Sequence, residues 1–418
     1  MIKSFKMLSE AYLRKQGLAI ALVEKALLII LCAFIFFSPF SVVFSKISFF
    51  WSVIFWLSLN ILRYKSKFYL YLIPNTVLNK SLFVFLVAAC ISVLFSVNLY
   101  HSQEIFFQRY LFYVIFFWIV YAVASQSRRN IFYFIFSILI LGLVIGIGGL
   151  VDHFRFCPDR LYTVFGRDLD LSVYLCFLLP FSFAVFLSPA KKLFKVLSLA
   201  NIVLLYPVFV LNASRSAWVF VVPVILLICF LQNKKVFFYS LMIVAITPFF
   251  MSNTLKDRAT SIVYAVNPAG FSRPVDGSIS ERIYLAQSAV DIFVKNPIFG
   301  SGLGTFEKLY RPSSTGACHL HVHVIYLEIL AEMGLVGFVS FLFILFIFFK
   351  KFIYYFKSWL VNNSFENAVM VGFGVSIFVV LLYNFGISSI LVGFQDALLF
   401  WFFMAIVVNE KIFYKNVS

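Results

Sequence analysis

The chain has 418 residues, of which 63% are hydrophobic, 20% are aromatic and only 12% are charged. Soluble domains carry roughly 25% charged residues, so this composition excludes a secreted enzyme, a nucleic-acid-binding protein and a disordered chain. The mean hydropathy of +0.99 and the 57 phenylalanines indicate a polytopic membrane protein instead.

Helices that cross a membrane need about 20 mostly apolar residues, and several runs of the sequence approach that length. We identify twelve, near residues 26–44, 47–62, 81–98, 105–124, 131–150, 170–188, 195–211, 216–232, 236–251, 324–349, 367–384 and 387–408. Because lipid offers no hydrogen bonds to backbone groups, each run is predicted to be a helix. The phenylalanines in these runs are interpreted as lipid-facing.

The predicted fold is therefore an all-α polytopic integral membrane protein with about twelve transmembrane helices and one large periplasmic loop that contains short helices. Residues 1–251 form an N-terminal transmembrane region of about nine helices, residues 252–323 form the loop, and residues 324–418 form a C-terminal transmembrane region of about three helices. No internal repeat is evident, which argues against the transporter folds that are built from repeats.

The net charge of +17 is unevenly distributed along the chain. With the N-terminus placed in the cytoplasm, the excess of basic residues falls entirely on the cytoplasmic side, and the other side carries as many acidic as basic residues. This is the positive-inside pattern, and anionic lipid head groups account for the charge without a nucleic acid. Both termini are thus predicted to be cytoplasmic and the large loop to face outward.

The six cysteines contain no CxxC pair, so neither a disulfide framework nor a zinc ribbon is indicated. Those inside apolar runs are interpreted as small hydrophobic residues: Cys32, Cys90, Cys176 and Cys229. Cys157 and Cys318 fall on the outward side, where disulfides form, and their pairing is left open.

Within the loop, residues 278–297 predict an amphipathic helix. Ser278 and Glu281 have the spacing of a capping box, and Pro297 follows the C-terminal end. The predicted buried face consists of the apolar residues that recur every three or four positions: Ile279, Ile283, Ala286, Val290 and Phe293.

Arg282 lies in the first turn of this helix and off its predicted buried face. Free N–H groups and the positive end of the helix dipole add to the charge of the guanidinium, so the position suits an anion. A solvated surface arginine is the alternative.

Gly300, Gly302 and Gly304 alternate after this helix, and glycines at this density allow positive φ angles and close backbone approach. No Lys-Ser/Thr pair follows, so a nucleotide-binding loop is not indicated.

Three histidines, His319, His321 and His323, alternate where the chain re-enters the membrane. Neutral imidazole is well suited to accept a proton near neutral pH. Metal ligation and a plain surface cluster are the alternatives. Glu328 and Glu332 follow four residues apart inside the next run, where ionisable side chains usually face a polar cavity or pair with another charge.

Arg215 stands between two apolar runs with no acidic neighbour in the sequence. A buried arginine needs an anion, from the protein or from a ligand, whereas an arginine that extends to the membrane interface does not. Asp396, inside the last run, is a candidate partner for an arginine, with a structural bond between helices as the alternative.

In this order around one outward loop, the motifs resemble the O-antigen ligase family of Gram-negative bacteria. They comprise Ser214-Arg215-Ser216, Arg282, residues 296–306, His321-Val322-His323 followed by Tyr326-Leu327-Glu328, and Glu332-Met333-Gly334. They cover about residues 212–337, and the chain length and twelve-helix layout are similar to those of enterobacterial members. The sequence departs from the family at Val324, where asparagine is common.

The resemblance implies an inverting glycosyltransferase in the bacterial inner membrane with a periplasmic active site. The donor would be O-antigen polysaccharide on undecaprenyl diphosphate and the acceptor a sugar hydroxyl of lipid A–core, with membrane lipids around the enzyme. No cofactor, ATP, metal or nucleic acid is implied.

The same resemblance assigns roles to individual residues. His323 matches the family's general base, and Arg215 and Arg282 match arginines that bind the donor diphosphate. His321, Glu328 and Asp396 would support the site, the last by its place in the final transmembrane run.

Three alternatives remain open from the sequence. A polymerase that extends O-antigen on the same carrier, or a ligase that glycosylates proteins, would share the fold and the donor. A polysaccharide flippase or other transporter belongs to a different class and would be expected to carry internal repeats.

Overall fold

The computed structural model describes residues 2–65, 73–156, 161, 168–266, 277–310, 322–386 and 389–409. All regular elements in these ranges are helices. The first are α1 (Ile2–Phe37), α2 (Val42–Lys65), α3 (Asn79–Leu94), α4 (Leu99–Ile105), the π-helical turn η1 (Phe106–Tyr110), α5 (Leu111–Gln126) and α6 (Arg128–Phe156). They are followed by α7 (Asp168–Phe186), α8 (Lys192–Leu211), α9 (Arg215–Gln232) and α10 (Lys234–Phe250).

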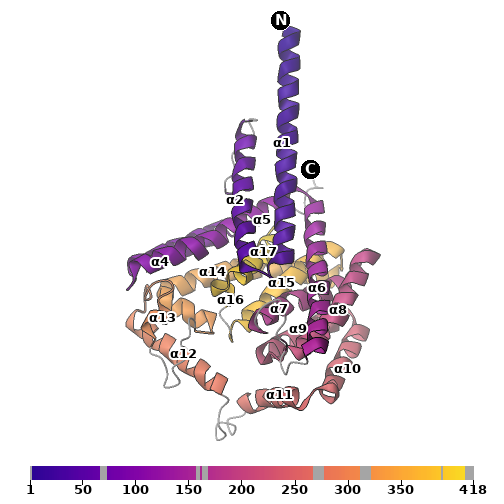
Figure 1. Ribbon diagram of the computed structural model, residues 1–418, viewed down its shortest axis with the longest axis vertical. Coiled ribbons are helices and arrows are strands. Elements are labelled where there is room, and N and C mark those ends of the chain that lie inside the picture. Colours follow the sequence, from indigo (N-terminus) through magenta and orange to yellow (C-terminus); the bar gives the residue numbers. More distant parts are fainter. Residues whose placement is uncertain are drawn as a thin grey trace.

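The segment after α10 holds α11 (Asn253–Val266), α12 (Gly277–Lys295) and α13 (Phe306–Leu309). The C-terminal part holds α14 (Ile325–Val361), α15 (Phe365–Tyr383), α16 (Ser389–Val392) and α17 (Phe394–Val407). The N-terminal part of α1 extends away from the bundle, and α11 and α12 lie at the opposite end of the molecule (Figure 1).

Each of the twelve apolar runs contains a helix, so the all-helical membrane fold is confirmed. Among the described residues, eight helices are long and apolar enough to cross a membrane, and three more apolar helices are shorter. Within the last predicted run, Gly393 separates the short α16 from α17, which has 14 residues. The count of twelve crossings stays a prediction.

The centre of the bundle is formed by α7, α15 and α17, and its packing corrects the interpretation of the phenylalanines. Every residue of α17 from Asp396 to Val407 is buried. Phenylalanines of these three helices pack edge to face or tilted against one another: Phe177, Phe181, Phe373 and Phe403. All four are fully buried. The lipid-facing interpretation is therefore wrong for the central helices, because ring pairs that fit each other gain packing energy that lipid does not provide.

The helix predicted over residues 278–297 is present, as α12, but its buried face is not the predicted one. Leu285, Ala289 and Ile292 are buried against Phe306, Tyr310, Val322 and Ala331. Two residues of the predicted face, Ile283 and Val290, are 43% and 44% exposed. The helix carries two apolar stripes, and periodicity does not distinguish the stripe that meets protein from the stripe that does not.

This correction changes the setting of Arg282. Arg282 precedes Leu285 by three and Ala289 by seven positions, so it lies on the same side of α12 as the buried stripe. It is half-buried and stands in the second turn, because α12 begins at Gly277. The side chain of Ser278, and with it the predicted capping box, lies outside the described side chains.

Candidate active site

The glycine-rich segment after α12 docks into an interruption of α14. Gly334 has φ +63° and ψ −164° within α14, which breaks the helical hydrogen-bond pattern. The carbonyls of Ala331 and Glu332 accept bonds from the N–H groups of Ser301 and Gly302, at 2.9 and 3.0 Å. In return, the N–H groups of Leu335 and Val336 donate to the carbonyls of residues 297 and 298, at 2.9 and 3.2 Å. Backbone groups released by the break are thus paired with the loop.

The three glycines adopt the positive φ angles that the sequence pattern allows. Gly300, Gly302 and Gly304 have φ of +74°, +110° and +69°. A Cβ on Gly300 would overlap the backbone of Glu332, and a Cβ on Gly334 would overlap the carbonyl of Ile298. Glycine is required at these two places because two backbones approach each other directly.

Glu332 fixes the same junction with its side chain. Its carboxylate accepts the N–H of Gly304 at 2.8 Å and the N–H of Phe306 at 3.2 Å, and the residue is 5% exposed. The hydroxyl of Ser92 in α3 donates to the Glu332 carbonyl at 2.6 Å. Glu332 therefore holds the loop against α14 through these hydrogen bonds, and Arg109 of η1 is an opposite charge that acts on it electrostatically.

His323 occupies a strained position at the start of α14. It has φ +60°, one of two positive-φ residues other than glycine in the described chain, and its side chain is half-buried. Residues before and after it are fixed, since Val322 is fully buried against α12 and the N–H of Ile325 donates to the carbonyl of Asn384 at 3.2 Å. Such strain persists where the surroundings over-determine it, often at functional sites.

Arg215 is the first residue of α9 and follows Ser214 in extended conformation. Its Nη1 donates to Ser261 Oγ of α11 at 3.0 Å. A cation at the N-terminus of a helix is disfavoured by the helix dipole. The positive charge of Arg215 therefore adds to the positive potential at the N-terminus of α9. This destabilises the protein when no anion is bound and would stabilise an anion bound there.

The ends of α9, α12 and α15 meet around Gly386. A Cβ at Gly386 would lie 2.8 Å from Ser216 Oγ and 3.6 Å from an Nη atom of Arg282, so both side chains lie beside this glycine. Tyr383 is fully buried, and Arg282 acts on it electrostatically. The two predicted arginine segments are thus brought together although they are far apart in the sequence.

His323 is linked to the same place through the end of α15. Asn384, which accepts the N–H of Ile325, lies between Tyr383 and Gly386. The hydroxyl of Tyr326 donates to the carbonyl of Leu381 at 2.9 Å, and its ring lies 4.5 Å from that of Phe385. The start of α14, which carries His323, is therefore held against the turn that contacts Arg282.

Glu328 and Asp396 are buried in a neighbouring polar cluster. Glu328 is 5% and Asp396 2% exposed. Glu328 acts electrostatically on Glu332 and on Tyr110, and Asp396 acts on Tyr113. Both acidic residues are thus placed near the turn η1 and the start of α5.

Arg109 belongs to this cluster and was not singled out from the sequence. It lies in η1, is half-buried, and acts electrostatically on Glu332, Tyr110 and Tyr113. Its place inside a predicted transmembrane run was a signal for it, because ionisable residues there are rarely incidental. The π-helical turn itself has no signature in the apolar pattern, although such turns are frequent at functional sites.

Several predicted positions lie outside the described residues. These are His319, His321, Cys157 and Cys318. In the part of the chain that the structure describes, no group of three or more His, Cys, Asp or Glu is arranged to hold a metal ion. The other four cysteines are free, and Cys176 and Cys229 are buried as expected for small hydrophobic residues.

Comparison with known proteins identifies the region that carries these residues. Residues 200–342 match the family model described as O-antigen ligase. The matched segment runs from α8 into α14 and includes Arg215, Arg282 and His323. No curated protein matches the chain in sequence. The match confirms, over these residues, the resemblance to the O-antigen ligase family seen in the motifs.

Proposed function

We propose that the protein transfers O-antigen polysaccharide from undecaprenyl diphosphate to a sugar hydroxyl of lipid A–core, with inversion at the anomeric carbon. The family comprises glycosyltransferase-like enzymes, ligases and polymerases, whose substrates are lipid-linked polysaccharides. The observation that carries the proposal is the meeting of Arg282, Ser216 and Tyr383 at Gly386, beside the turn that holds the start of α14 and its strained His323.

The chemistry assigned to each residue follows from where charge develops. The acceptor hydroxyl oxygen attacks the anomeric carbon from the face opposite the diphosphate, and its proton passes to His323. The bond between the anomeric carbon and the diphosphate oxygen breaks, and the leaving diphosphate keeps the electron pair. Arg215 and Arg282 stabilise this growing negative charge, since guanidinium groups form paired hydrogen bonds to phosphate oxygens.

The energy source of the transfer and the position of the site in the membrane are both consistent with this reaction. The diphosphate ester is already activated, so neither ATP nor a resident metal is part of the proposal. A donor and an acceptor that are both anchored in lipid require a site at the outer surface of the inner membrane. We therefore propose that Arg215, Arg282 and His323 face the periplasm and that both termini are cytoplasmic, in line with the positive-inside pattern of the sequence.

Single-residue variants test the site in cells that lack their own ligase. His323→Ala should abolish O-antigen attachment to lipid A–core while the protein remains in the membrane, because the base is lost and the helices are not. Arg215→Lys should also be strongly impaired, because an ammonium keeps the charge but loses the planar fork. Attachment is read from the lipopolysaccharide pattern and protein level from membrane fractions.

Matched controls distinguish these roles from general damage. His153→Ala and Arg155→Lys change the same residue types in α6, where His153 is half-buried and Arg155 is exposed. Both control variants should retain attachment. Normal attachment by His323→Ala would remove His323 from the mechanism, and full activity of Arg215→Lys would reduce Arg215 to an interface anchor.

A further inference from the structure

The hydroxyl of Tyr383 is buried beside the arginine segments without a hydrogen bond. Tyr383 is the last residue of α15 and is fully buried. Among the residues that the structure describes, its hydroxyl has no hydrogen-bond partner. The hydroxyls of Ser172 in α7 and Ser214 are close to it, and Arg282 acts on it electrostatically. A buried polar group without a partner destabilises a protein, so its presence in a native structure calls for an explanation.

The chemistry of its neighbours restricts which group accepts a hydrogen bond from this hydroxyl. A guanidinium group only donates hydrogen bonds, so Arg282 offers no acceptor. The hydroxyl of Ser172 already donates to the side-chain oxygen of Asn212, at 2.5 Å. Ser214 directly precedes Arg215, and its side chain makes no capping hydrogen bond to α9. Of the two serines, Ser214 is therefore the one whose hydroxyl is able to turn towards a ligand.

The turn between α8 and α9 holds Ser214 in a fixed place. Ala213 is buried and has φ +56°, which is strained for a residue other than glycine. Asn212 before it is held by the bond from Ser172. Ser214 follows in extended conformation, and its carbonyl accepts the first helical bond of α9, from the N–H of Trp218 at 3.0 Å. The Ser214 side chain therefore lies at the N-terminus of α9, next to Arg215.

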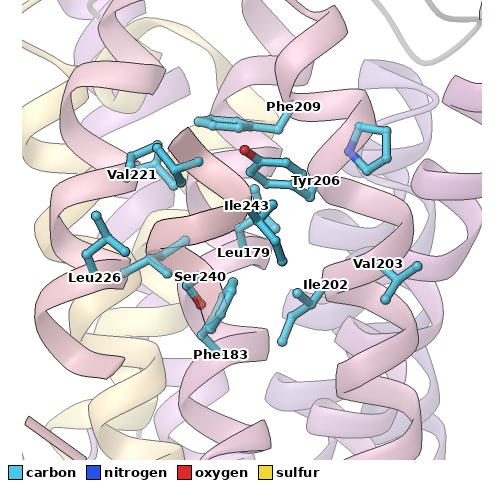
Figure 2. A pocket seen from close by; sticks show the side chains of 14 residues that line it. Leu179, Phe183, Ile202, Val203, Tyr206, Phe209, Val221, Leu226, Ser240 and Ile243 are labelled. Carbon is cyan, nitrogen blue, oxygen red and sulfur yellow. The ribbon is translucent and has the colours of Figure 1, made fainter. Parts of the chain in front are cut away.

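The apolar groove between α7, α8, α9 and α10 does not supply a partner for the Tyr383 hydroxyl. Its lining is apolar apart from Tyr206 and Ser240 (Figure 2). Neither Ser214 nor Tyr383 lines it. An acceptor for the Tyr383 hydroxyl therefore has to come from the junction of α9, α12 and α15.

We infer that Ser214 is a further residue of the diphosphate site and that Tyr383 is a positioning residue for its hydroxyl. With the diphosphate at Arg215, the Ser214 hydroxyl donates a hydrogen bond to a phosphate oxygen and accepts one from Tyr383. Such a chain strengthens both bonds, because each donor polarises the next. The inference rests on the proposed function. It assigns Ser214 a contact with the substrate, whereas Tyr383 acts through Ser214.

The sign of a stability change distinguishes this role from a packing role. Tyr383→Phe deletes a hydroxyl that has no partner among the described residues. Without an anion, its unfolding midpoint should equal or exceed that of the wild type, because a buried group without a partner is removed. Tyr326→Phe is the opposite case, since the Tyr326 hydroxyl donates to the carbonyl of Leu381 at 2.9 Å, and its midpoint should fall. A lower midpoint in Tyr383→Phe would contradict the inference.

Inorganic pyrophosphate, without added metal, is the probe for a binding test on the purified full-length protein in nanodiscs. It should raise the unfolding midpoint of the wild type. Its Kd, from calorimetric titration, should increase about tenfold in Tyr383→Phe and in Ser214→Ala, which corresponds to about 1.4 kcal/mol. In the double variant the increase should also be about tenfold, because the two residues act as one unit.

Two control variants remove similar groups elsewhere. Tyr355→Phe changes a buried tyrosine in the second half of α14, and Ser198→Ala changes a buried serine inside α8. Both should bind pyrophosphate as the wild type does. Three results would overturn the inference. They are unchanged Kd in Tyr383→Phe, a hundredfold increase in the double variant, and no stabilisation of the wild type by pyrophosphate.

A transfer assay separates the inference from the proposed function. In Tyr383→Phe, kcat/KM for the undecaprenyl-diphosphate-linked donor should fall about tenfold. Weaker pyrophosphate binding in both variants, with no transfer by the wild type, would leave the roles of the two hydroxyls in anion binding and remove the function. Transfer by the wild type with unchanged kcat/KM in Tyr383→Phe would leave the function and remove the inference.

Discussion

Removal of the Glu332 carboxylate should loosen the junction between the glycine-rich segment and α14. In the wild type this carboxylate accepts the N–H groups of Gly304 and Phe306 at 2.8 and 3.2 Å in a buried position. Glu332→Ala leaves both donors without an acceptor, at about 1–3 kcal/mol for each buried group. The total is about 2–6 kcal/mol, and the lower value already changes an equilibrium about thirtyfold.

Hydrogen exchange resolves where this free energy is lost. Exchange of the Gly304 and Phe306 amides should speed up about thirtyfold or more in Glu332→Ala, while amides in the centre of α15 keep their protection. In Glu332→Gln these exchange rates should lie between those of the wild type and of Glu332→Ala. The glutamine side-chain oxygen accepts one of the two bonds, but its NH₂ group faces the second N–H donor and cannot accept from it. Glu307→Ala, at an exposed acidic position of α13, is the control and should change neither amide. Unchanged exchange at Gly304 and Phe306 in Glu332→Ala would show that the Glu332 carboxylate does not hold the loop against α14.

Three further predictions concern single positions. Gly334→Ala should lower the unfolding midpoint, because φ +63° and the overlap with Ile298 both oppose a Cβ. Gly17→Ala, where a Cβ would have nothing within 4 Å, should leave the midpoint unchanged or raise it, and a lower midpoint for both variants would contradict this reasoning. His323→Asn should lose transfer but keep the amide protection of the first turn of α14, because asparagine tolerates positive φ; residual transfer near the wild-type level would contradict it. Tyr326→Phe should destabilise the start of α14 by about 0.5–1.5 kcal/mol, because the hydrogen bond to the Leu381 carbonyl is lost. The change is measured from denaturant midpoints, and an unchanged midpoint would show that this bond does not contribute to stability.

The helices could be predicted from the sequence because their signals are local, whereas a shared role of the two arginines was expected only from the family resemblance. Apolar runs of sufficient length report helices directly, and the order of motifs around one outward segment led to Arg215, Arg282 and His323. The alternation of Gly300, Gly302 and Gly304 allowed positive φ, and the structure shows it at all three residues.

Features that depend on the partner of a side chain were missed. The face of α12 was assigned to Ile283 and Val290, because nothing in that helix reveals that Leu285 and Ala289 meet Val322 and Ala331. Glu332 was expected at a polar cavity or an opposite charge, and Arg109 does act on it electrostatically. Its hydrogen-bond partners, the N–H groups of a loop nearly thirty residues earlier, were not predicted. Such pairings arise only when distant segments pack, and a single sequence does not encode them visibly.

The central claim is tested most directly by reconstitution of the purified protein with undecaprenyl-diphosphate-linked O-antigen and lipid A–core, without ATP and with a chelator present. We expect a high-mass lipopolysaccharide ladder from the wild type and none from His323→Ala. Longer glycans on the lipid carrier, with no product on lipid A–core, would contradict ligation and indicate a polymerase. No product of either kind would contradict the assigned roles of Arg215, Arg282 and His323.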